Sequence, residues 1–279
     1  MRRLGQHFLK NQNAVRAIVH ALALEAGDTI IEIGSGHGEL TKPILEDCET
    51  KSCAVVAIEK DSRLALDLFQ FKNASFPNVA FKVLEGDARV LLKEIVANYS
   101  TPQNPPISGS RGKLPITNYK IVGNIPYYIT GNLLRIISEL ESKPACAVLM
   151  LQKEVGERLM ASPPRMNLLA AATQIWADVS VVCRLAPHDF APSPKVASLV
   201  LKFTPHAPSL LREEERERYY QFIKNMFRQP RKTILNNLES GLTISRAEIE
   251  TILVKQGVSP RLRPQNLSIQ NLITLSSCF

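Results

Sequence analysis

Short apolar runs alternate with longer amphipathic segments through the first half of the chain. An apolar run bounded by glycine or polar residues predicts a buried strand. Such runs occur at residues 29–33, 54–58, 79–84, 120–122 and 145–151. Segments with helical spacing occur at residues 13–24, 40–48 and 63–71. Strands that alternate with helices predict an α/β fold built on a doubly wound, mainly parallel sheet.

The pattern changes after residue 205. Residues 211–226 predict a highly charged helix, and further helical segments follow without any return of a strand pattern. The sequence therefore predicts two domains, an α/β domain over residues 1–205 and a small helical domain over residues 206–279.

A segment rich in proline, serine, glycine and asparagine interrupts the α/β pattern at residues 98–118. This composition predicts a long surface loop inserted before the fourth strand. The basic side chains of Arg111 and Lys113 leave open the alternative that the segment is an arm that contacts RNA.

Composition narrows the class of protein. The net charge of +8 on 279 residues is typical of proteins that bind a polyanion, although a well-solvated surface can also be basic. The five cysteines include no Cys-x-x-Cys pair, so neither a disulfide framework nor a metal site is expected, and a reducing, cytoplasmic compartment fits best. Apolar runs long enough for a secretory signal or a membrane span are not found, so we expect no membrane association.

A glycine-rich turn, Gly34-Ser35-Gly36-His37-Gly38, separates the first predicted strand from the helix that follows. Glycines in such a turn allow the backbone to approach a ligand closely. The fingerprint of an NAD-dependent dehydrogenase would place a third glycine at position 39, where this chain has Glu39. The Gly-x-Gly-x-Gly spacing instead favours an enzyme that binds S-adenosylmethionine.

Acidic residues follow the next two predicted strands. A carboxylate at Glu59 can accept hydrogen bonds from both hydroxyls of a ribose. Asp87 can accept one from the exocyclic amine of a bound adenine. Alone, Glu59 could be an exposed charge and Asp87 a helix cap. Because the carboxyl ends of parallel strands meet at one edge of a sheet, the two residues and the glycine-rich turn predict a single nucleoside site.

The tetrapeptide Asn124-Ile125-Pro126-Tyr127 follows the fourth predicted strand. The Asn124 side-chain oxygen and the Ile125 carbonyl can both accept hydrogen bonds from an amine on a planar base. Pro126 stiffens the turn, and the ring of Tyr127 offers a face on which a base can stack. The alternative is a strand-to-helix turn with an asparagine cap and a buried tyrosine.

Taken in this order, these motifs resemble the ribosomal RNA adenine dimethyltransferases, and most closely their small-subunit enzymes. Further matching segments lie at residues 4–9, 151–159, 190–196 and 227–238. The resemblance covers nearly the whole chain except residues 98–118. It departs from the family at Ser35, where proline is common, and at residues 165–169, which replace a stretch that usually contains Tyr-Gly.

The resemblance implies a Rossmann-like class I methyltransferase sheet and a site made of named residues. S-adenosylmethionine would be bound by His7, Leu9, Gly34, Glu59, Asp87 and Asn124. The catalytic turn would be Asn124, Ile125, Pro126 and Tyr127, and the target adenine would lie between Tyr127 and Phe190. Acceptors at Asn124 and Ile125 would position N6 of the adenine for methyl transfer, without a general base or a metal.

The implied partner is small-subunit ribosomal RNA within the pre-30S particle, and the protein is expected to be a monomer. Dimethylation of two adjacent adenosines in the 3′-terminal hairpin of 16S RNA is the implied reaction, and exposed basic side chains would bind phosphates. Candidates for this role are Arg228, Arg231, Lys232, Arg261 and Arg263. Two alternatives remain open: a large-subunit RNA adenine methyltransferase, and an RNA-binding assembly factor that does not need catalysis.

Overall fold

The computed structural model describes residues 7–99 and 118–279. Within these ranges a seven-stranded sheet has the order β4-β3-β2-β5-β6-β9-β7. Its strands are β2 (Thr29–Ile33), β3 (Ala54–Glu59), β4 (Ala80–Glu85), β5 (Tyr119–Asn124), β6 (Cys146–Gln152), β7 (Ala177–Leu185) and β9 (Ser198–Pro205). The pairings among β2 to β6 are all parallel, which confirms the predicted α/β fold with a mainly parallel sheet.

The sequence patterns did not predict β7 and β9. β9 pairs antiparallel with β6, with Leu149 opposite Leu201, and extends the sheet past its parallel part. β7 lies at the edge of the sheet and is only partly buried, so its apolar residues form no continuous run. Such a half-exposed edge strand carries a weaker hydrophobic signal than the buried parallel strands.

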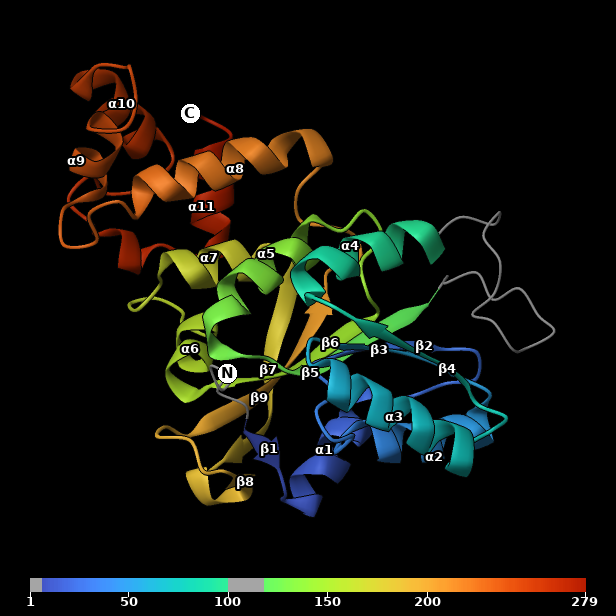
Figure 1. The fold of residues 1–279 in the computed structure, drawn as a ribbon. Helices are drawn as coiled ribbons and strands as arrows, with labels where there is room; N and C mark the ends of the chain where they lie inside the picture. The colour runs from blue at the N-terminus through green and yellow to red at the C-terminus, as the bar shows by residue number, and fades with distance from the viewer. Residues whose placement is uncertain (1–6, 100–117) are drawn as a thin grey trace. The chain divides into compact units, whose positions relative to one another are not determined.

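Helices cover both faces of the sheet: α1, α2 and α3 on one face, and α4 and α5 on the other (Figure 1). Their bounds are α1 Gln12–Leu22, α2 Thr41–Lys51, α3 Ser62–Ser75, α4 Ala88–Tyr99 and α5 Thr130–Glu139, and α6 is Lys153–Leu159. Side chains fix where two of them begin. Asn11 accepts hydrogen bonds from the first backbone N–H groups of α1, and Asp61 does the same for α3.

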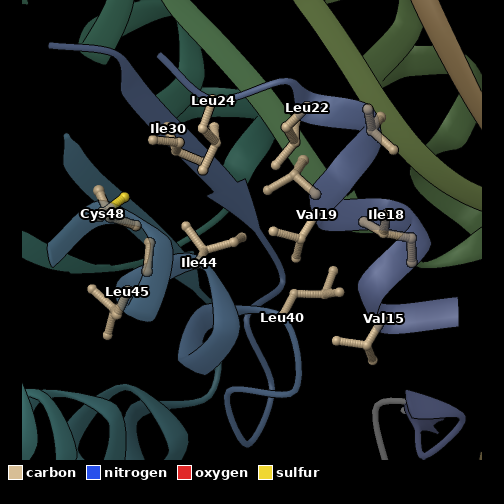
Figure 2. Packing of buried hydrophobic residues seen from close by; sticks show 14 of the residues in the cluster. Val15, Ile18, Val19, Leu22, Leu24, Ile30, Leu40, Ile44, Leu45 and Cys48 are labelled. Carbon is tan, nitrogen blue, oxygen red and sulfur yellow. The ribbon is translucent and has the colours of Figure 1, made fainter. Parts of the chain in front are cut away.

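The core on the first face is formed by the apolar stripe of α1 and by α2. Figure 2 shows the labelled side chains gathered around the two helices and Ile30. They include Val15, Ile18, Val19 and Leu22 of α1, Ile44, Leu45 and Cys48 of α2, and Ile30 of β2. The recurrence of apolar residues every three to four positions along α1 places one face in the core and leaves the other in water. This packing holds β2 and the glycine-rich turn that follows it in place.

The described chain divides into two compact units, residues up to 156 with 179–205, and residues 157–178 with 206–279. The second unit is helical, with α7 Leu168–Gln174, α8 Glu213–Met226, α9 Ile234–Glu239, α10 Arg246–Lys255 and α11 Ile269–Ser276. The fully buried Tyr219 of α8 donates a 3.1 Å hydrogen bond to the Ala171 carbonyl of α7. Residues 157–178 therefore pack with the C-terminal helices, although they precede the domain boundary predicted near residue 205.

Three short 3-10 helices complete the described chain: η1 Tyr127–Ile129, η2 Pro187–Asp189 and η3 Pro264–Asn266. The loop expected at residues 98–118 falls almost entirely outside the described residues. Of the helices in the described ranges, none combines the length and apolar character needed to cross a bilayer.

Candidate functional site

A cleft lies where the parallel strands β2, β3, β4 and β5 have their carboxyl ends. Its volume is about 1080 Å³, including space that is open to solvent. Residues at or just beyond each strand end line it, in chain order Gly34, Glu59, Asp87 and Asn124. Ligands of open α/β sheets bind outside the carboxyl ends of the strands, so this cleft is the candidate site.

The glycine-rich turn forms the floor of the cleft because its backbone adopts conformations that other residues avoid. Gly34 and Gly36 have φ values of +72° and +58°. A Cβ atom on Gly34 would lie 3.2 Å from the carbonyl oxygen of Asn124. The turn therefore forms a cradle that a side chain at Gly34 would partly fill.

Glu59 holds this turn against the end of β3. Its carboxylate is buried, and Oε2 accepts a 2.9 Å hydrogen bond from the backbone N–H of Gly36. Oε1 accepts two more, from the N–H groups of Lys60 and Asp61. Because a carboxylate offers about four acceptor positions, about one remains for a ligand in the cleft.

Glu32 is a second buried carboxyl in the wall of the cleft, and the sequence analysis did not identify it. The Thr41 hydroxyl donates a 2.7 Å hydrogen bond to its Oε2 atom. Burial raises the pKa of Glu32 to about 8, so this carboxyl keeps its proton at neutral pH. An ionisable residue within an apolar strand, Thr29-Ile30-Ile31-Glu32-Ile33, was the available sequence signal.

Asp87 follows β4 and begins the turn into α4. Its side chain accepts hydrogen bonds from Arg89, and the Lys60 ammonium lies 3.5 Å away. The Arg89 hydrogen bonds are the main reason that the pKa of Asp87 lies well below its usual range. The carboxylate is therefore ionised at any physiological pH and presents a fixed negative charge at the rim of the cleft.

Asn124 ends β5 and is oriented by the N-terminal segment. Its Nδ2 donates a 2.8 Å hydrogen bond to the backbone carbonyl of His7. This bond identifies which end of the amide carries the nitrogen and leaves Oδ1 as an acceptor, to which no donor among the described residues bonds. The adjoining Ile125 and Pro126 also line the cleft.

The N-terminal segment is held over the cleft by a two-stranded sheet. β1 (Phe8–Leu9) pairs antiparallel with β8 (Phe190–Ala191), beside which it lies in Figure 1. The His7 ring donates from Nδ1 to the Pro192 carbonyl at 2.8 Å. The Phe8 ring lies 4.3 Å from the ring of His37 in the glycine-rich turn. Segments from both ends of the first unit thus close one wall of the site.

The structure brings most of the predicted site residues into this one cleft. They are His7, Leu9, Gly34, Glu59, Asp87, Asn124, Ile125 and Pro126. Tyr127 begins η1, but its side chain lies outside the described part of the structure. Phe190 is 1% exposed, packs in the apolar core and does not line the cleft. Tyr128, which the sequence analysis did not name, lines the cleft and is 66% exposed.

The comparison with family models and the comparison with named proteins agree on the family that this chain resembles. A family model described as ribosomal RNA adenine dimethylase matches residues 1–278. A protein named ribosomal RNA small subunit methyltransferase A from Lactobacillus helveticus is 36% identical over 278 residues, covering 98% of this chain and 89% of the relative. A protein of the same name from Moorella thermoacetica is 34% identical over 275 residues, covering 98% and 90%.

Solved structures share the fold at lower identity. A dimethyladenosine transferase from Plasmodium falciparum has a TM-score of 0.76 and 24% identity, with 96% of each chain covered. The 23S rRNA methyltransferase ErmE has a TM-score of 0.71 and 22% identity, with 97% of this chain and 98% of that one covered. These likenesses confirm the class I methyltransferase fold.

Proposed function

The chain belongs to the ribosomal RNA adenine dimethylase family, and we propose that it dimethylates N6 of two adjacent adenosines in the 3′-terminal hairpin of small-subunit (16S) RNA. It is an S-adenosylmethionine-dependent methyltransferase. The observation that carries the proposal is Asn124, whose side-chain oxygen is left as an acceptor in a cleft formed by four strand ends. The names of the relatives support the small subunit as the target.

The cleft fits S-adenosylmethionine in the nature of its donors, acceptors and backbone. The cradle at Gly34 and Gly36 would accept the part of the cofactor that comes closest to the backbone. Glu59 would accept from a ribose hydroxyl at its one remaining position, Asp87 would accept from the adenine amine, and Asn124 would contact the cofactor as well as the base. His7 and Leu9 would close the site from the N-terminal segment. When bound, the cofactor supplies a methyl group on a positively charged sulfur, open to attack by a nucleophile.

The target nitrogen is a poor nucleophile because its lone pair is delocalised into the adenine ring. Oδ1 of Asn124 and the carbonyl of Ile125 would each accept a hydrogen bond from the N6 amine, which favours a tetrahedral nitrogen with its lone pair directed away from the acceptors. Catalysis then comes from positioning and electrostatics. The nitrogen loses its proton to water after it has become positively charged, so no general base is assigned.

The target base must leave its stack to enter the cleft. We propose that Tyr127 stacks on it, with a contribution of about 1–3 kcal/mol. A contact between Phe190 and the base requires the Phe190 side chain to leave the core, where it is now buried. A second transfer requires the same cleft to readmit N6-methyladenine.

We propose that the helical second unit binds the RNA backbone. Five of its exposed cations are the candidates for this role: Arg228, Arg231, Lys232, Arg261 and Arg263. Side chains of this kind bind phosphates without reading sequence, and they make affinity depend on salt. The ribosomal partner would be the pre-30S particle, encountered by a monomer in the cytoplasm.

The proposal is tested with radiolabelled S-adenosylmethionine and small subunits that lack the modification. Digestion of the RNA should yield labelled N6,N6-dimethyladenosine with the wild-type protein, and no label with Asn124→Ala. Asn13→Ala, which alters an exposed asparagine on α1, is the matched control and should retain full transfer. Large-subunit RNA is assayed in parallel, and label confined to it would instead identify a large-subunit enzyme. Tight particle binding without any label would identify an assembly factor.

A further inference from the structure

The acceptor atoms of Asp87 are occupied by the chain's own Arg89. Oδ1 accepts hydrogen bonds from both the backbone N–H and Nε of Arg89, each at 3.0 Å. Oδ2 accepts one from Nη2 at 2.7 Å and lies 3.5 Å from Nζ of Lys60. Three of the roughly four acceptor positions of the carboxylate are therefore taken by one residue.

The remaining position, on Oδ2, faces the Lys60 ammonium at 3.5 Å, so a ligand that binds Asp87 must displace one of these cations. An adenine amine that enters the cleft must donate to Oδ1 or Oδ2, and the Arg89 guanidinium binds to both. The backbone hydrogen bond from Arg89 forms part of the first turn of α4 and does not depend on the arginine side chain. Only the side-chain bonds therefore compete with a ligand.

Asp87 lines the cleft, and its pair with Arg89 is exposed enough to exchange with water. The Arg89 side chain is 36% exposed and that of Asp87 is 24% exposed. Ion pairs with this exposure contribute little net stability and are weakened by salt. Tyr128 also lines the cleft and is 66% exposed. The hydrogen bond to Asp87 is the main cause of the raised pKa of Arg89, and Tyr128 adds to it. A guanidinium that leaves Asp87 thus enters water beside an exposed aromatic ring.

We propose that Arg89 is a positioning residue that competes with the adenine amine of the cofactor for Asp87 and must leave this carboxylate when the cofactor binds. The inference rests on the proposed function, because it takes the adenine of the cofactor to be the ligand of Asp87. Arg89 then sets cofactor affinity and makes it depend on ionic strength.

The test is isothermal titration calorimetry of the wild-type protein and Arg89→Ala with S-adenosylhomocysteine, which carries no net charge. We expect Arg89→Ala to bind about fivefold more tightly, the amount that corresponds to the loss of a half-exposed ion pair. Raising the salt concentration should strengthen binding to the wild-type protein, because salt weakens the competing ion pair, and should have a smaller effect on Arg89→Ala, which keeps only the Lys60 pair. Arg135→Ala removes an ion pair with Glu139, remote from the lining of the cleft, and is the matched control.

A second ligand shows whether Arg89 competes with the adenine amine for Asp87 or alters ligand binding to the cleft in general. S-inosylhomocysteine has a carbonyl oxygen in place of the adenine amine, so Arg89→Ala should not bind it more tightly than the wild type does. Unchanged or weaker binding of S-adenosylhomocysteine by Arg89→Ala would overturn the inference, as would an equal gain for both ligands. Failure of every variant, wild type included, to bind S-adenosylhomocysteine would overturn the proposed function as well.

Discussion

Replacing Glu32 by glutamine tests whether a protonated carboxyl is built into the wall of the cleft. The side chain is 1% exposed, and the Thr41 hydroxyl donates to it at 2.7 Å. Glutamine keeps the shape of the protonated carboxyl, retains an oxygen that can accept from Thr41, and cannot ionise. Glu32→Gln therefore removes the titration while preserving the packing and the hydrogen bond.

The size of the effect follows from two pKa values. Burial raises the pKa of Glu32 to about 8 in the folded protein, against 4.5 for an ordinary glutamate. Between these values the unfolded chain has lost its proton and the folded protein has kept it, so the free energy of unfolding falls as pH rises. At about 1.4 kcal/mol per pKa unit, the fall contributed by Glu32 from pH 5.5 to pH 8.5 is about 3 kcal/mol.

The assay is urea unfolding across this pH range without added ligand. The free energy of unfolding of the wild-type protein should fall by about 3 kcal/mol more than that of Glu32→Gln. The variant should be the more stable of the two at pH 8.5. Glu46→Gln, which changes an exposed glutamate of α2, should follow the wild type and serves as the control. Parallel pH profiles for the wild type and Glu32→Gln would show that this carboxyl is already ionised in the folded protein, and the reasoning would fail.

Other substitutions test the cleft and the proposed RNA surface. Asn124→Ala should lower kcat by about 100-fold or more in a methyl-transfer assay, because it removes an acceptor directed at the reacting amine; an unchanged kcat would exclude that role. Gly34→Ala forces a residue with a side chain into a φ of +72°. Urea unfolding should show a loss of about 1–2 kcal/mol, and calorimetry a weaker affinity for S-adenosylhomocysteine. Arg231→Ala with Lys232→Ala should weaken RNA binding and reduce the slope of its salt dependence by about two phosphate contacts, whereas an unchanged slope would place the RNA elsewhere.

The parallel strands and the strand-end residues were predictable because both depend on local pattern. Continuous apolar runs identify buried parallel strands, and the carboxyl ends of such strands share one edge. Gly34, Glu59 and Asp87 could therefore be assigned to one site before any contact was known, and the family resemblance added Asn124. The structure places all of them in the lining of the cleft.

Most of the remaining features depend on contacts between distant segments, which no local pattern reports. Whether Phe190 faces a ligand or the core depends on the pairing of β8 with β1, and this pairing puts its side chain in the core. The partner of Asp87 was missed because Arg89, two residues away, has no special spacing. Residues 157–178 belong with the C-terminal helices because of tertiary contacts such as that between Tyr219 and Ala171.

The antiparallel pairing of β1 with β8 has a consequence for the order of folding. The hydrogen bond between His7 and Pro192 joins positions 185 residues apart, so the wall that orients Asn124 cannot form until most of the chain has been synthesised. Contacts between such distant segments form late, because they require the closure of a long loop. A growing chain that has not yet emerged beyond β8 would thus have its parallel strands and glycine-rich turn but an open site. Competence to bind substrate would then be acquired in one of the last folding steps, after the sheet that supports it.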